Sequence, residues 1–159
     1  MGRMTSSDIS TTADRTATGS GGPGGLSGVH HIGLTVTDGQ RSKRWYSEVL
    51  GMVEWMQEEY PGGRTIGMMR PGTGLFIGLD THERNGAEEF APHRTGLDHL
   101  ALAVDSRADL EAWHRHLVAV GVDCGEVREF THPGSGAVCT FTDPDGIALE
   151  LMYVDPAGA

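Results

Sequence analysis

Apolar residues alternate with small or polar residues over residues 31–36, and the same pattern returns over residues 99–104. A period of two residues predicts β-strands that bury one face. Both stretches begin with a histidine, His31 and His99, and each histidine is followed at the same spacing by a tryptophan. The pattern therefore indicates a duplicated module.

The elements predicted after each histidine strand also repeat. In the first half, helical spacing of apolar residues predicts a helix over 40–50 that ends at Gly51. Turn signals then separate three predicted strands, at 52–58, 64–70 and 75–80. In the second half, a predicted helix over 107–120 ends at Gly121, and three strands follow, at 124–130, 137–142 and 147–154. Each half is thus predicted to be β-α-β-β-β.

Changes in composition predict how the chain is divided. Residues 1–28 contain mostly Ser, Thr and Gly and few apolar residues, which predicts a disordered tail. We expect a first module over 29–80, a polar linker over 81–96, a second module over 97–155 and a short tail over 156–159. The predicted fold class is therefore α+β, with two βαβββ modules.

Charge and composition exclude several classes of partner. The net charge of -10 opposes binding to the phosphates of nucleic acid. The chain has neither the roughly 18-residue apolar run of a membrane helix nor a secretory signal, so we expect a cytoplasmic protein. Cys124 and Cys139 lie in different predicted elements without CxxC spacing, which predicts reduced, buried thiols.

Three predicted strands share one unusual face. The faces that carry His31 and His99 otherwise hold only small residues, and in the last strand Glu150 lies beside Ala148 while the opposite face is apolar. A buried carboxylate without a partner is costly, so Glu150 needs a compensating group. A divalent metal held by His31, His99 and Glu150 would supply it and would leave coordination positions open.

The motifs at these residues resemble those of a known superfamily. HHIGLTVTD, WYSEVLGM, GLDHLALAVDS and FTDPDGIALEL are similar to motifs of the vicinal oxygen chelate superfamily, also called the glyoxalase, bleomycin resistance and dioxygenase superfamily. The resemblance covers about residues 29–155. It implies paired βαβββ modules whose curved mixed sheets enclose a cavity, with metal ligands at His31, His99 and Glu150.

Departures from the family motifs weaken the case for three kinds of reaction that the family carries out. Gly78 stands where glyoxalases and epimerases of the family carry a fourth ligand, and Asp80 lies two residues further on the same face. Ring-cleaving dioxygenases share the ligand trio, but Thr140 replaces their tyrosine, and Gly74 and Leu75 stand where their acid-base histidine is expected. Residues 131–140 also lack the phosphonate-binding residues of fosfomycin-modifying transferases.

The sequence offers further candidates for the chemistry and for substrate binding. His82 and His93, in the linker, are candidate acid-base groups because histidine titrates near neutral pH. His114 and His116 flank Arg115 on the second helix and are expected to face solvent. Candidates for substrate binding are Arg64, Arg70, Arg94 and Trp55.

These features predict a metal-dependent enzyme that chelates a small molecule through adjacent oxygens, with a dioxygenase-like reaction preferred over a glyoxalase-type lyase or isomerase. Iron(II) fits two histidines and one carboxylate best, and manganese, zinc and nickel accept the same donors. The alternative is a non-catalytic protein that binds an antibiotic or another aromatic ligand, as bleomycin-resistance proteins do. We expect a homodimer, in which the site lies either within one chain or between two.

Overall fold

The computed structural model describes residue 25 and residues 28–132 and 134–156, so most of the predicted N-terminal tail lies outside the described residues. The first module contains β1 (Ile32–Thr35), α1 (Gly39–Leu50), β2 (Val53–Tyr60), β3 (Gly63–Met69) and β4 (Phe76–His82). The second contains β5 (Leu100–Ala103), α2 (Arg107–Ala119), β6 (Arg128–Phe130), β7 (Gly136–Thr142) and β8 (Ala148–Val154). The predicted α+β class with two βαβββ units is confirmed.

Each module forms its own four-stranded mixed sheet, with orders β1-β4-β3-β2 and β5-β8-β7-β6. The first strand of each module pairs in parallel with the last, and the remaining pairs are antiparallel. Among the described residues, no strand of one sheet pairs with a strand of the other. The two curved sheets therefore stay open within one chain.

Both helices begin and end within one residue of the predicted bounds. The Asp38 side chain caps α1 by accepting hydrogen bonds from the backbone N–H groups of Gln40 and Arg41. Gly51 ends α1 in the left-handed conformation with φ 63°, which glycine adopts without steric cost. Ser106 caps α2 by accepting from the N–H of Asp109. Both helices are too short to cross a bilayer, and the described chain has no other candidate span.

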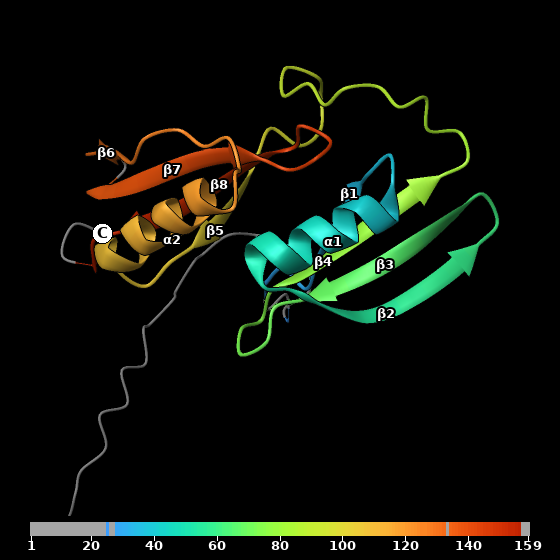
Figure 1. Cartoon of the computed structure of the whole chain (residues 1–159), viewed down its shortest axis with the longest axis horizontal. Helices are drawn as coiled ribbons and strands as arrows, with labels where there is room; N and C mark the ends of the chain where they lie inside the picture. The colour runs from blue at the N-terminus through green and yellow to red at the C-terminus, as the bar shows by residue number, and fades with distance from the viewer. Residues whose placement is uncertain (1–24, 26–27, 133, 157–159) are drawn as a thin grey trace, which may run out of the picture.

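Helix α1 packs on β3 and β4, and helix α2 packs on β7 and β8 (Figure 1). The modules meet through contacts between α1 and the second module. The hydroxyl of Tyr46 on α1 donates to Asp143 Oδ2 at 3.2 Å, and the Trp45 ring stacks on Phe141 at 6.3 Å between centroids. One apolar core therefore includes residues from both modules.

Two expectations about the second module need correction. The strand predicted over 124–130 contains only β6, because one extra residue separates the Cys124–Phe141 bridge from the Arg128–Val138 pair and interrupts the ladder. His114 and His116 were expected to face solvent, but both are half-buried. His116 Nε2 lies 2.9 Å from the carbonyl oxygen of Val49, so α2 packs this side chain against the end of α1.

Candidate metal-binding site

The faces that the alternation pattern selected are open in the structure. His31, Gly33 and Thr35 are exposed while Leu34 between them is buried, and Ala101 and Ala103 are exposed beside buried Leu100. Strand pairing places Gly33 beside Gly78 and Ala101 beside Glu150. Gly78 is therefore the structural counterpart of Glu150, as the sequence predicted, and the repeat is asymmetric at this position.

His99 and Glu150 lie together on the second sheet. The Nε2 atom of His99 is 3.6 Å from Glu150 Oε2, and its Nδ1 atom is 2.7 Å from Asp98 Oδ1. The hydrogen bond with Asp98, followed by the charge of Glu150, raises the pKa of His99. A histidine whose second ring nitrogen is held by a carboxylate is typical of metal ligands, because the carboxylate fixes the ring orientation.

The Glu150 side chain is only 20% exposed. Among the described residues, its one ion-pair contact is with His99. A partly desolvated carboxylate that faces an imidazole nitrogen across 3.6 Å leaves room for a cation between the two donors. Imidazole and carboxylate together could hold iron(II), manganese, zinc or nickel.

His31 lies on the first sheet beside a cavity of about 330 Å³. Its Nδ1 atom is 2.9 Å from Nδ1 of His30, whose ring stacks on Phe76 at 6.2 Å. Trp55, which is 63% exposed, lines the same cavity and meets Phe76 edge-on at 5.5 Å. This cavity therefore combines an imidazole ligand candidate with aromatic walls.

Asp80 also lines this cavity, where Thr65 donates a hydrogen bond to its Oδ1 atom. A Cβ atom added to Gly33 would come within 2.9 Å of Asp80 Oδ2, and one added to Gly78 within 3.5 Å. The carboxylate of Asp80 thus lies above Gly33 and Gly78. A side chain on residue 78 would contact it.

Within one chain the three predicted ligands do not converge. The His31 cavity is lined by the first module alone, whereas His99 and Glu150 belong to the second sheet. His31, His99 and Glu150 are not among the sets of described residues whose ligand atoms all lie within 4.8 Å of one another. The structure therefore brings together two of the three residues and leaves His31 on the other sheet.

The remaining candidates lie in several other places. Arg64 and His82 line a separate cavity at the far end of β3 and β4, together with Tyr60. Arg94 pairs with Glu88 at 2.5 Å, and His93 is exposed in the loop between the modules. Trp55 is therefore the only one of the proposed substrate-binding residues that lines the His31 cavity.

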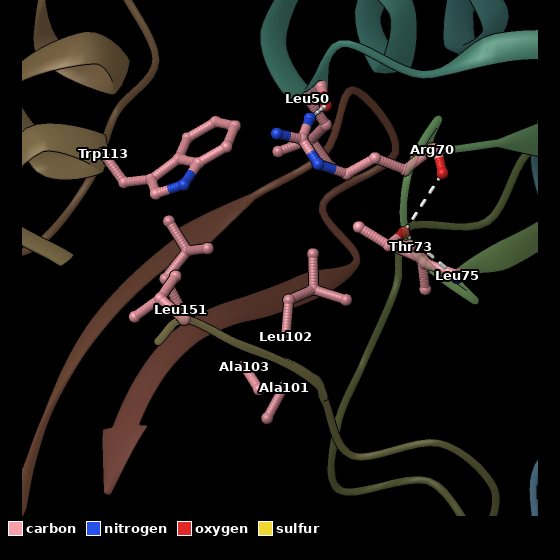
Figure 2. Close-up of a pocket in the computed structure, with 10 residues that line it drawn as sticks. Leu50, Arg70, Thr73, Leu75, Ala101, Leu102, Ala103, Trp113 and Leu151 are labelled. Atoms are coloured by element: carbon pink, nitrogen blue, oxygen red, sulfur yellow. Dashed lines mark hydrogen bonds between the residues drawn. The ribbon is translucent and has the colours of Figure 1, made fainter. Parts of the chain in front are cut away.

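Arg70 lies between the modules and serves a structural role there. Its guanidinium donates to the carbonyl oxygen of Leu50 and lies over the Trp113 ring, 5.1 Å from the ring centre (Figure 2). Arg70 and Trp113 line a cavity of about 240 Å³ along β5. Ala101, Leu102 and Ala103 of β5 form another wall of this cavity (Figure 2). This cation–π contact joins the first sheet to α2.

A further cluster was missed by sequence reasoning. His114, Cys124 and Cys139 place their ligand atoms within 4.8 Å of one another, and both cysteines are free thiols. Burial, and secondarily Cys124 and Glu126, raises the pKa of Cys139 to about 11, so this thiol is not an activated nucleophile at neutral pH. The three residues are far apart in the sequence and follow no metal-binding spacing, so no local signal could have found them.

Comparison with known proteins agrees with this architecture. The model of the glyoxalase/bleomycin resistance protein/dioxygenase superfamily matches residues 28–151. The chain is 34% identical to uncharacterized protein YaeR of Escherichia coli strain K12, over 80% of this chain and 96% of the relative. It is 31% identical to uncharacterized protein YwkD of Bacillus subtilis strain 168, over 79% of this chain and 96% of the relative.

Two solved structures show the same fold. A glyoxylase/bleomycin resistance protein/dioxygenase domain from Frankia sp. EAN1pec is 37% identical, with a TM-score of 0.75 over 82% of this chain and 100% of that domain. The fosfomycin resistance protein FosX of Listeria monocytogenes is 18% identical, with a TM-score of 0.63 over 82% of this chain and 94% of FosX. At that identity, the likeness to FosX concerns the fold alone.

Proposed function

Because the chain belongs to the glyoxalase/bleomycin resistance protein/dioxygenase superfamily, we propose that it is a metal-dependent enzyme whose ligands are His31, His99 and Glu150. One observation carries this proposal. The Nε2 atom of His99 faces the Glu150 carboxylate at 3.6 Å while Asp98 holds the opposite ring nitrogen. This is the arrangement that orients an imidazole toward a cation.

The surrounding residues favour a small substrate that binds through oxygen atoms. Ala101 and Ala103 are small and exposed beside His99 and Glu150, which leaves space above the second sheet. On the first sheet, Asp80 takes part of the space above Gly33. A cation held by three protein ligands has open positions and supplies Lewis acidity to substrate oxygens. The chain's own contribution is to orient His99 through Asp98 and to shape the pocket with Trp55 and Phe76.

The absence of a ligand at Gly78 favours a dioxygenase-like reaction over a glyoxalase-type lyase or isomerase. Two histidines and one carboxylate form the facial triad of non-haem iron(II) oxygenases, and iron(II) is therefore the preferred metal. Asp80 lies near the vacant position, but its carboxylate accepts a hydrogen bond from Thr65. We infer that Asp80 stays in this bond and does not replace a ligand on residue 78.

We further propose that a homodimer completes the site. β1 and β5 are edge strands of their sheets, and each lies next to a ligand candidate, His31 or His99. A two-fold dimer that places β1 of one chain beside β5 of the other would extend both sheets and satisfy their free edges. It would also bring His31 of each chain beside His99 of the partner subunit, so the dimer would contain two such sites.

Metal stoichiometry tests the proposal directly. The metal-free protein should bind about one manganese ion per chain, measured by the loss of free Mn²⁺ signal in electron paramagnetic resonance, because manganese prefers imidazole and carboxylate to thiolate. His99→Ala and Glu150→Gln should abolish this binding, whereas His93→Ala, in the exposed loop, should retain it. Unchanged binding by His99→Ala would contradict the proposed site. Oxygen consumption by the iron(II)-loaded protein with catechols and 2-hydroxyketones then tests the reaction class.

The aromatic walls of the His31 cavity support a second candidate function. Exposed Trp55 and His30 and half-buried Phe76 line this cavity of about 330 Å³, which suits a flat aromatic molecule. In this alternative the protein binds an antibiotic or another aromatic ligand without catalysis. Thermal stabilisation of the metal-free protein by such a ligand, without turnover after metal loading, would favour it.

A further inference from the structure

Three side chains with metal-binding chemistry converge on the helical side of the second sheet. His114 comes from α2, Cys139 from the middle of β7, and Cys124 from the segment that leads into β6. The imidazole and the two sulfurs all lie within 4.8 Å of one another. Cys139 is fully buried, and the other two residues are half-buried.

Strand pairing explains why the two thiols meet. Cys124 forms an isolated antiparallel bridge with Phe141, and the Gly125 N–H donates to the Thr140 carbonyl oxygen at 2.8 Å. Directly paired residues point to the same face of a sheet, and so do residues two apart on one strand. Cys124 and Cys139 are therefore diagonal neighbours on the face that α2 covers, and this face receives His114.

We propose that His114, Cys124 and Cys139 form a second metal site, for a thiophilic closed-shell cation of the Zn²⁺ type. Two thiolates and one imidazole are preferred donors for Zn²⁺, at about 2.3 Å for sulfur and about 2.0 Å for nitrogen. Donor atoms already within 4.8 Å of one another need only to close by about an ångström to reach the separations of a tetrahedral site. Binding would release the two thiol protons to solvent and would leave the fourth position for water.

The electrostatic surroundings suit a cation. The whole chain carries a net charge of -10, and Asp123 and Glu126 flank the Cys124–Gly125 segment. The site lies on the side of the second sheet that packs against α2, so it shares no residue with the proposed His31, His99 and Glu150 site. The second site can therefore be tested independently of the proposed function.

Cobalt(II) spectroscopy distinguishes the two sites, because only the second contains sulfur. We expect reduced, metal-free full-length protein to develop a thiolate-to-cobalt charge-transfer band with Co²⁺, and Zn²⁺ to remove the band by displacement. Cys124→Ser should abolish the two-thiolate band without removing a buried group, and His114→Gln should weaken Co²⁺ binding. Glu150→Gln and His93→Gln should keep the full band.

Cys139→Ser tests the buried ligand. It should also lose the two-thiolate band, and its thermal unfolding in the absence of metal shows whether it folds like the unmodified protein. If Cys139→Ser does not fold, the spectrum of Cys124→Ser alone tests the proposed second site. Absence of the charge-transfer band in fully reduced protein, or a band that persists at full intensity in Cys124→Ser, would overturn the inference.

Discussion

At the scale of single residues, Asp98 orients the His99 ring through one hydrogen bond. It holds Nδ1 of His99 at 2.7 Å and so directs Nε2 toward Glu150. Asp98→Asn weakens this orientation, and we expect metal affinity to fall by about 10–100-fold, which is typical for loss of a carboxylate behind a histidine ligand. Competition with a fluorescent chelator measures the affinity. Asp105→Asn, an exposed carboxylate after β5, is the control, and equal affinities for the two variants would contradict the assigned role.

Asp143 gives a pH prediction at the same scale. Burial raises its pKa above 3.8, although the N–H groups of Ile147 and Asp145 donate to it. A carboxyl with a raised folded-state pKa is protonated more in the folded than in the unfolded protein just above pH 3.8. Its stabilisation is therefore fully present below pH 3.8 and is lost as pH rises through the folded pKa.

Asp143→Asn keeps an acceptor for both N–H groups and cannot titrate. The free energy of unfolding of the unmodified protein, minus that of the variant, should therefore fall as the pH rises above 3.8 and level off once the carboxyl is ionised in the folded protein. Urea denaturation across this range measures the difference. Asp123→Asn, at an exposed position, controls for the effect of an aspartate-to-asparagine change itself. A difference that rises with pH would mean that the hydrogen bonds outweigh burial.

Residue-scale predictability follows from local geometry. In a strand the side-chain period is two, so the sequence alone assigned His31, His99 and Glu150 to open faces, and the structure places all three beside small residues. On a helix the face depends on which neighbour covers it. Arg115 is exposed, yet His114 and His116 on either side of it are half-buried against β7 and α1, which no local pattern indicated.

At the scale of elements, the β7–β8 turn holds the start of α1 in place. The Asp145 carboxylate accepts from Thr37 N–H at 3.2 Å, Thr37 Oγ1 at 2.5 Å and Arg41 Nη2 at 2.6 Å. The Asp145 side chain is only 9% exposed, whereas the donors Thr37 and Arg41 are exposed, so water reaches one side of these bonds. The DPDG motif therefore acts as more than a hairpin turn, because it joins the second module to the first.

Asp145→Ala removes all of these acceptors and leaves the Thr37 N–H without its partner. We expect a loss of about 2 kcal/mol in the free energy of unfolding, from several hydrogen bonds of about 1 kcal/mol each with a discount for the exposed Arg41. Chemical denaturation measures it. Asp123→Ala should change stability by less than about 0.5 kcal/mol. A loss for Asp145→Ala no larger than this control would show that the turn does not join the modules.

Element boundaries were predictable where capping and turn residues mark them, as Asp38, Gly51 and Ser106 do for the helices. The edge strand β6 was not. Its shortening comes from one extra residue between Cys124 and Arg128 relative to β7, and such a bulge is set by pairing with another strand. The same bulge turns Cys124 to the sheet face that carries Cys139. One irregularity therefore explains both the short strand β6 and the cysteine cluster that the sequence did not predict.

At the scale of the whole molecule, the sequence predicted both modules but not how they face each other. The modules join through α1, α2 and the β7–β8 turn, and this arrangement leaves β1 and β5 as separate edges. The apolar content of each half specifies which faces are buried, whereas the pairing of two sheets depends on contacts between distant residues. Under the proposed homodimer, the three ligands come together only between two chains, and this arrangement can be tested.

A mixed dimer tests this assembly. If the site forms between subunits, a homodimer of His31→Ala lacks one ligand at both sites, and so does a homodimer of Glu150→Ala. In the mixed dimer, one site combines His31 of the Glu150→Ala chain with the intact second module of the His31→Ala chain. The other site then lacks both ligands.

We therefore expect the mixed dimer to bind about one Mn²⁺, half the stoichiometry of the unmodified dimer, while each variant homodimer binds none. Differently tagged chains, co-purified over two affinity steps, give the mixed species, and electron paramagnetic resonance counts the bound ions. Re-mixed unmodified chains carrying the same tags control for the purification. If the ligands all came from one chain, each site of the mixed dimer would lack a ligand, and its binding would be no better than that of the variant homodimers.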